Sequence, residues 1–226
     1  MAAFRLLSLK ARLRYFPYQG NPFRIENGTK VPCEGKLLYR GYNILDLVRG
    51  LENEHRFGFE EVAYLLLFGS LPNDVQLKQF RTVLCEAMRL PTNFTRDVIM
   101  KAPSADIMNS MTKSILTLAS YDKNVADLSL DNVIRQCISL IAVFPMLAVY
   151  GYHAYNHYEK DDSFYIHRPN LELSMAENIL AMLRPDKKYS ELEARVLDIA
   201  LPLVLILLAS LSLVGDSYNP FLYFQF

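Results

Sequence analysis

The sequence lacks tryptophan and a surplus of charge of either sign, and it contains three cysteines. Its 24 Lys and Arg residues balance 24 Asp and Glu residues, which argues against a nucleic-acid-binding protein because such proteins usually carry a basic excess. Cys33, Cys85 and Cys137 lie far apart and form no C-x-x-C pair. The cysteines therefore exclude a zinc knuckle and a disulfide scaffold, and they indicate a reducing, cytoplasmic compartment.

Motifs for common enzyme chemistries are also missing. The chain has no GxxxxGK[ST] or GxGxxG phosphate loop, no HExxH zinc motif and no GxSxG nucleophile elbow, so no cofactor is expected. What the chain does have is apolar material. Of its 226 residues, 51% are hydrophobic and 12% aromatic, enough to build a core for one or two domains.

Glycine is unevenly distributed along the chain. Seven of the nine glycines lie between Gly20 and Gly69, and Gly151 alone lies between positions 70 and 214. Because glycine weakens the interior of helices and strands, we expect turns and short strands in the first third and helices in the rest. The predicted fold class is therefore mainly α with a small β element near the start.

The local patterns predict one hairpin and a series of helices. Alternating residues bounded by glycine predict a strand or hairpin over 35–44. Asn73 and Ser104 are expected N-caps, and two S-x-x-E capping boxes begin at Ser174 and Ser190. A kink is expected at Pro145. The predicted helices cover residues 46–51, 59–68 with a stop at Gly69, 74–89, 92–100, 105–119 and 130–158, and one follows each capping box.

The two ends of the chain differ from the middle. Residues 1–20 carry four basic residues and no acid, which is typical of a mitochondrial transit peptide or of a frayed basic N-terminus. Residues 201–214 carry no charge. As a helix these 14 residues would span about 21 Å, short of the ~30 Å hydrocarbon core. A membrane tail anchor, a buried helix and a stretch of unrelated residues all remain open, and membrane binding is not expected.

Histidines form one suggestive pattern. His153 and His157 are four residues apart, so they share one face of a helix and could bind a metal ion. Asp161, Asp162 and His167 could complete such a site if a loop folded back. The alternative is that these side chains are the polar tips of a surface helix, and no metal site is assigned.

Cysteine and arginine offer two further candidates. Cys85 and Cys137 lie in apolar helical contexts, where cysteine acts as a small hydrophobe, and Cys33 lies beside an acid that disfavours its thiolate. Arg40 lies in a predicted turn, where it could bind a carboxylate or could satisfy backbone carbonyl groups. Residue chemistry alone thus indicates an intracellular helical protein.

Two longer motifs resemble a known family. The stretches GKLLYRGYNI (35–44) and FEEVAYLLLFGSLP (59–72) are similar to the citrate synthase pattern G-x-L-x-Y-R-G-Y-x-I followed by F-E-E-V-A-Y-L-L-L-F-G-x-L-P. Residues 173–183 and 192–201 resemble two later helices of that family. The resemblance covers about residues 28–201 and is strongest to bacterial members.

The resemblance implies a fold and an activity. The fold would be the N-terminal part of the large helical domain of a citrate-synthase-like protein, with a short β-hairpin near its start, working as a homodimer. The family condenses acetyl-CoA with oxaloacetate to give citrate and CoA. There an Asp removes a methyl proton, a His holds the enol, and a second His and several Arg bind oxaloacetate in a closed cleft.

The sequence departs from the family pattern after Leu201. The family continues D-I-A-L with V-L-H-x-E-H-G-G-G-N-N-S-T, whereas here Asp198-Ile-Ala-Leu201 is followed by PLVLILLAS, and no histidine follows His167. No catalytic, cofactor-binding or metal-binding residue can therefore be carried over. We expect three segments: a non-homologous or disordered 1–27, an incomplete helical domain over 28–201, and a non-homologous apolar tail over 202–226.

This departure leads to a functional expectation and two alternatives. The chain is expected to be a truncated citrate synthase, inactive alone, and a reading-frame shift after residue 201 would explain the loss; another frame of the gene would then encode H-x-E-H-G-G-G-N. One alternative is a non-catalytic module that dimerises through residues 104–119 and 130–149. The other is a tail-anchored membrane relic. The choice between citrate and 2-methylcitrate as product stays open.

Overall fold

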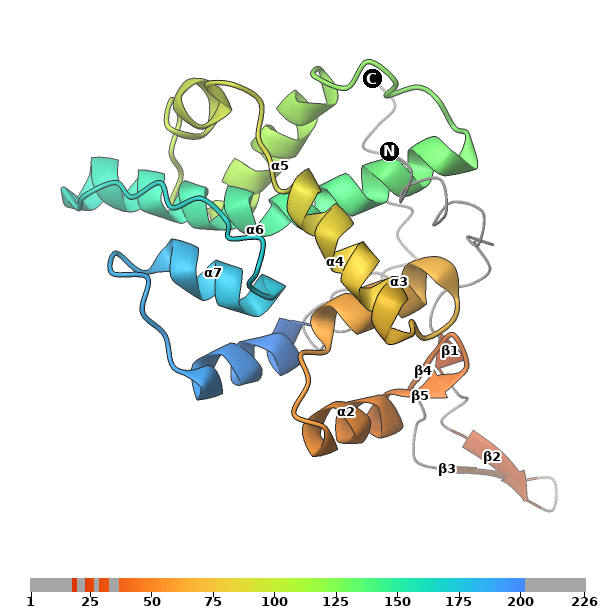
Figure 1. Ribbon diagram of the computed structural model, residues 1–226. Helices are drawn as coiled ribbons and strands as arrows, with labels where there is room; N and C mark the ends of the chain where they lie inside the picture. The colour runs from red at the N-terminus through yellow and green to blue at the C-terminus, as the bar shows by residue number, and fades with distance from the viewer. Residues whose placement is uncertain (1–17, 20–22, 27–28, 33–36, 202–226) are drawn as a thin grey trace.

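The computed structural model describes residues 18–19, 23–26, 29–32 and 37–201. These residues form a mainly helical protein, as predicted (Figure 1). The helices are α2 (Ile44–Asn53), α3 (Phe59–Phe68), α4 (Asp74–Ala87), the π-helical turn η1 (Thr95–Ile99), α5 (Ile107–Ala119), α6 (Leu130–Lys160) and α7 (Met175–Leu183). Residues 191–201 are also helical.

Short antiparallel strands precede the helices. The predicted hairpin over 35–44 is confirmed as β4 (Leu37–Tyr39) and β5 (Tyr42–Asn43), with Tyr39 paired to Tyr42. Its turn residues Arg40 and Gly41 have φ angles of 50° and 92°, which is typical of the tight turns that match strand twist. Strand β1 (Tyr18–Gln19) extends this sheet, and β2 (Phe23–Glu26) pairs with β3 (Thr29–Pro32) in a separate hairpin that was not predicted.

Local capping chemistry sets several helix ends where the sequence predicted them. Asn73 and Ser174 each form a complete capping box at the start of α4 and α7. Ser190 and Glu193 exchange the same pair of hydrogen bonds before the helical stretch 191–201. Gly69 ends α3 with a left-handed φ of 81°, a conformation that glycine adopts without steric cost.

Several predicted helix boundaries were wrong, and α2 is longer than the expected 46–51. Helix α5 begins at Ile107, because Asp106 accepts from the Asn109 backbone N–H and acts as the N-cap; Ser104 instead accepts from the Asp106 N–H. The helix expected over 92–100 is reduced to η1, and α4 ends at Ala87. Helix α6 runs through Pro145 as one element.

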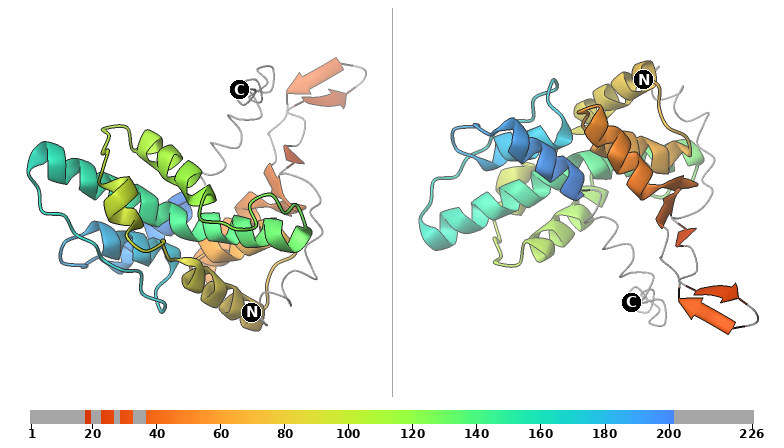
Figure 2. Two further views of the ribbon diagram at one scale, coloured as in Figure 1. Left: turned by 90° about the horizontal axis from the view of Figure 1, so that it is seen from above. Right: turned by 90° about the horizontal axis from the view of Figure 1, so that it is seen from below.

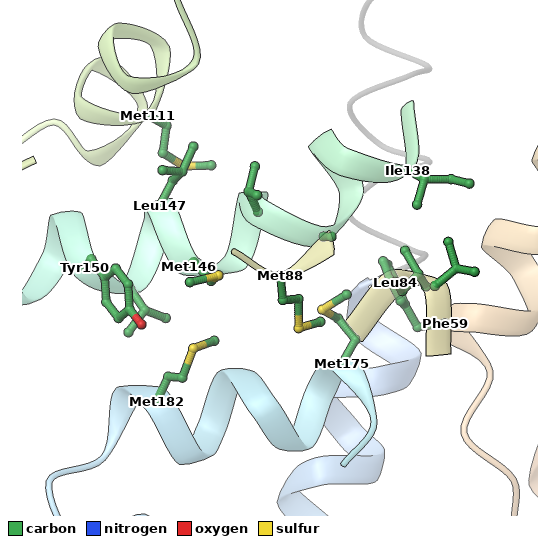
Figure 3. Packing of buried hydrophobic residues seen from close by; sticks show 14 of the residues in the cluster. Phe59, Leu84, Met88, Met111, Ile138, Met146, Leu147, Tyr150, Met175 and Met182 are labelled. Atoms are coloured by element: carbon green, nitrogen blue, oxygen red, sulfur yellow. The ribbon is translucent and has the colours of Figure 1, made fainter. Parts of the chain in front are cut away.

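Helix α6 is the centre of the core. It contacts α4, α5, η1 and α7, and Figures 1 and 2 show it crossing the molecule between them. Figure 3 shows the methionine-rich packing along α6, in which flexible thioether side chains fill the irregular space between helices. The buried methionines of this cluster are Met88, Met111, Met146, Met175 and Met182.

Membrane association is not needed to explain the apolar character of α6. The helix is long and apolar enough to cross a bilayer, with a mean hydropathy of 1.8 over its most apolar window, and 44% of that window is buried inside the protein. Buried core helices pass the same test of length and composition. Nearly all of the apolar stretch 201–214, for which a tail anchor was one alternative, lies outside the described residues, as does most of the basic segment 1–20.

Candidate functional site

The histidines of the predicted metal cluster face backbone carbonyl groups. His153 is 6% exposed and its Nε2 lies 3.2 Å from the Met182 carbonyl oxygen. His157 Nδ1 lies 2.8 Å from the Asp162 carbonyl, and His167 Nε2 lies 3.1 Å from that of Pro185. A carbonyl oxygen only accepts, so each of these nitrogens is an N–H donor. The histidines therefore tie the 161–173 segment and α7 to α6.

A polar pocket of about 430 Å³ lies beside the His153 ring. Its lining includes His153, Asn156, Asp161 and Asp162. Among the residues that the structure describes, no three His, Cys, Asp or Glu side chains are grouped as metal ligands would be. Phe164 instead packs its ring against both His153 and His157, at centroid distances of 6.4 and 6.1 Å. The pocket is thus built from loop-anchoring contacts.

Neither described cysteine is activated. Cys85 is buried, with Sγ 3.6 Å from the Leu171 carbonyl oxygen. Burial, reinforced by the negative charge of Glu60, raises the pKa of the Cys85 thiol, and burial also raises the pKa of the Cys137 thiol. A raised pKa disfavours the nucleophilic thiolate, which agrees with the expected packing role. Cys33 lies outside the described residues.

Arg40 has the structural role that was left open for it. Its Nε and Nη2 donate to the Leu66 carbonyl oxygen over 3.1 and 2.7 Å. The guanidinium group thereby satisfies a carbonyl in the last turn of α3, where helical carbonyl groups lack partners within the helix. Tyr39 beside it is buried, and burial raises the pKa of its phenol to about 12. The hairpin is therefore fixed to α3.

The first turn of α3 contains a buried charged junction that the sequence did not predict. Asp198 is 3% exposed, and its carboxylate oxygens accept from the backbone N–H groups of Gly58 and Phe59 at 2.5 and 3.2 Å. These donors lie about 140 residues away in the sequence. Burial, with repulsion from Glu60, raises the pKa of Asp198 to about 6, although the two N–H groups and Arg81 oppose the shift.

Two glutamates of the same turn are also buried. Glu60 is 4% exposed, and its Oε1 accepts from the Met175 N–H over 2.8 Å. Glu61 is 8% exposed and pairs with Arg56. Burial raises the pKa of Glu61, and Arg56 opposes that shift. One helical turn thus binds α7 on one side and the stretch 191–201 on the other.

A small pocket of about 240 Å³ opens next to Asp198. Glu52, His55, Arg56 and Arg195 contribute charged or titratable groups to its wall. His55 Nδ1 accepts from Arg195 Nη1 over 2.9 Å, since arginine has no acceptor. The pocket holds an acid and an imidazole, but both already have partners within the protein.

A pocket of about 470 Å³ lies between the end of α4, α5 and α6. Its wall is mostly apolar, and Arg89, Asp122, Arg135 and Gln136 line it as polar groups. Arg135 donates to the Asp122 carboxylate over 2.6 Å and holds the pKa of that carboxyl below its usual range. None of the described residues that line it is a histidine or a cysteine. The described lining residues do not form an acid–base pair.

Comparison with known proteins decides the family. The family model described as "Citrate synthase, C-terminal domain" matches residues 19–205. The chain belongs to the citrate synthase family. The matched range encloses the expected residues 28–201, and the fold class agrees with that of a solved relative. The citrate synthase structure from Pyrobaculum aerophilum superposes with a TM-score of 0.58 at 22% identity, over 70% of this chain and 39% of that chain.

Sequence relatives carry two related names. The citrate synthase of Saccharolobus solfataricus is 32% identical over 131 residues, which are 57% of this chain and 32% of the relative. The 2-methylcitrate synthase of Shewanella oneidensis is 32% identical over 117 residues, which are 51% of this chain and 28% of the relative. The chain thus spans about a third of the length of these members of the citrate synthase family.

The family motifs have structural roles in this part of the protein. Arg40 of the first motif bonds Leu66 of the second, and Glu60 of the second bonds Met175 of the third. Asp198 of the last motif joins it to the second motif by capping α3. The sequence left one signal for the last contact: Gly58 precedes α3, and glycine has no side chain that could cap it.

Proposed function

We propose that this chain supplies part of the helical scaffold of a citrate-synthase-type acyltransferase, which condenses acetyl-CoA with oxaloacetate to citrate and CoA. The single observation behind this proposal is the family match over residues 19–205. The relatives include a citrate synthase and a 2-methylcitrate synthase. The proposal therefore names an acyl-CoA as the substrate class and does not choose between the two products. The cysteine pattern supports a cytoplasmic, reducing location.

The 226-residue chain is proposed to be inactive by itself. After Asp198-Ile-Ala-Leu201 the sequence continues with PLVLILLAS and contains no further histidine. General acid–base catalysis needs titratable groups within hydrogen-bond reach of the substrate. The described histidines His55, His153, His157 and His167 all have a ring nitrogen bonded within the protein. They therefore act as structural contacts.

A direct assay tests the proposed inactivity. Release of the CoA thiol is followed after acetyl-CoA and oxaloacetate are mixed with the purified full chain at high concentration, beside a full-length citrate synthase at matched concentration. We expect release equal to the protein-free blank. Oxaloacetate-dependent release above that blank, rising with chain concentration, would contradict the proposal.

An apolar surface supports self-association as the second candidate function. Large hydrophobic side chains are exposed on α5 and α6, namely Met108 (60%), Leu116 (62%), Leu140 (39%) and Phe144 (41%). Full burial of a fully exposed side chain of this kind contributes about 1.5–3 kcal/mol, and these side chains, at 39–62% exposure, would contribute about half of that each. A homodimer formed through these two helices would cover them.

Light scattering after size exclusion tests this surface. We expect the wild-type chain to elute as a dimer or larger species, and Leu116→Glu with Phe144→Glu to shift it toward the monomer. Val75 on α4 is 66% exposed and outside this surface, so Val75→Glu is the matched control and should not change the mass. A monomeric wild-type chain would contradict the proposed interface.

A further inference from the structure

The helical stretch 191–201 is attached to the junction between α2 and α3 at two points. Arg195 Nη1 donates to His55 Nδ1 over 2.9 Å, across 140 positions of sequence. One helical turn later, Asp198 accepts from the Gly58 and Phe59 N–H groups. Leu201, the last described residue, lies three positions beyond Asp198. These contacts therefore hold the final described turn.

The Asp198 contact is unusual for a helix cap because it is buried. Ordinary caps such as Asp106 on α5 are exposed and local, whereas Asp198 is 3% exposed. Removing an ionised carboxylate from water disfavours its charged form.

Charged groups on every neighbouring element face this carboxyl group. Glu60 on α3 is itself 4% exposed and repels it, and Arg81 on α4 attracts it. Glu52, His55 and Arg56 of the α2–α3 segment and Arg195 of its own helix share the adjoining pocket. Burial outweighs the attractions, and the pKa of Asp198 is raised from 3.8 to about 6.

We propose that Asp198, with Arg195 and His55, forms a proton-tightened clasp that holds residues 191–201 on the α2–α3 junction and loosens when the Asp198 carboxyl group ionises. The clasp is a conformational device of the fold and does not depend on the proposed enzymatic activity. The state that binds a proton more tightly is favoured by acid. The closed clasp is that state, because opening returns Asp198 to water.

The size of the effect follows from the two pKa values. With 3.8 in the open state and about 6 in the closed state, the opening constant is about tenfold larger at pH 7.5 than at pH 5.0. The Arg195–His55 contact is exposed, and exposed charged contacts contribute little, so Asp198 sets the sign of the pH dependence.

Hydrogen exchange of two backbone amides reads the clasp directly. The Gly58 and Phe59 amides of the full chain exchange when their hydrogen bonds to the Asp198 carboxylate break. Their protection factors are corrected for intrinsic exchange at each pH. The amide of Leu147, in the buried middle of α6, reports global unfolding and should be protected more strongly than the Gly58 and Phe59 amides at both pH values. We expect the protection factors of Gly58 and Phe59 to be about tenfold higher at pH 5.0 than at pH 7.5.

Two variants separate this carboxyl group from other titrations. Asp198→Asn cannot ionise, so the protection factors of Gly58 and Phe59 should change less than twofold between the two pH values. Asp106→Asn alters an exposed cap of the same residue type and should keep the tenfold change. Equal protection of Gly58 and Phe59 at both pH values in the wild-type chain would overturn the proposal, and so would a tenfold change that persists in Asp198→Asn.

Discussion

Replacing Glu60 by Ala removes the contact that joins α3 to α7. Glu60 Oε1 accepts from the N–H of Met175, the first residue of α7, over 2.8 Å. Both residues are buried, at 4% and 1% exposure. The first N–H groups of a helix have no partner within the helix. Ser174 supplies an acceptor for the Glu177 N–H, and Glu60 supplies the one for Met175.

The magnitude follows from leaving that donor buried and unpaired. A hydrogen bond to a charged group contributes about 1.5–3 kcal/mol, and a buried donor without a partner costs about 1–3 kcal/mol. We therefore expect Glu60→Ala to lower the free energy of unfolding by about 2–3 kcal/mol. Glu60→Gln keeps an acceptor oxygen and removes a negative charge close to Asp198, so its effect should stay below about 1 kcal/mol.

Urea denaturation followed by circular dichroism measures both variants. The Ala variant should shift the midpoint at an unchanged slope, whereas the Gln variant should unfold near the wild type. The Gln variant should also lower the pKa of Asp198 from about 6 toward its ordinary value, because the repulsion from Glu60 is gone. Equal losses in the Ala and Gln variants would refute the argument, since they would show that the acceptor oxygen is not what matters.

Four other outcomes are expected. Phe80→Ala should cost about 3–5 kcal/mol in urea denaturation, because Phe80 is fully buried against two other rings; the exposed Val75→Ala should cost less than about 0.5 kcal/mol, and equal costs would contradict the assigned core. Asn73→Ala removes the capping box and should cost about 1 kcal/mol; an unchanged midpoint would contradict that role. Alkylation of Cys85 at pH 8 should be slower in the folded chain than in urea, because burial raises its thiol pKa. Ionisation of Asp198 should lower the free energy of unfolding. Its contribution is fully present below pH 3.8 and is lost as the pH rises through about 6. The free energy of unfolding of the wild type should therefore fall over this pH range, and this part of the fall should be absent from Asp198→Asn.

Helix positions followed from local chemistry in most of the chain. Helix α3 begins and ends at the predicted residues, because an apolar run is stopped by Gly69. The N-cap at Asn73 and the capping box at Ser174 formed as predicted, because such a cap needs residues only three apart. The start of α5 was wrong for the same local reason: Asp106 competes with Ser104 and reaches the N–H of Asn109.

The contacts of the candidate site residues could not be predicted from local sequence. The spacing of His153 and His157 correctly placed them on α6, but it contained no information on which carbonyl oxygens would face their rings. The role of Arg40 depended on Leu66, which is 26 positions away. Both alternatives considered for Arg40 agreed with the sequence, because guanidinium groups bind carboxylates and carbonyl oxygens alike.

The sequence by itself determined the family, the mainly helical class, the hairpin turn and the caps of α4 and α7, because each depends on motifs or on residues a few positions apart. The tertiary structure alone decided which polar groups are buried together. Glu60 and Asp198 look like ordinary surface acids on amphipathic helices, yet folding places both within one buried junction that joins three segments. Burial and long-range pairing set their chemistry, and both arise only when distant parts of the chain meet.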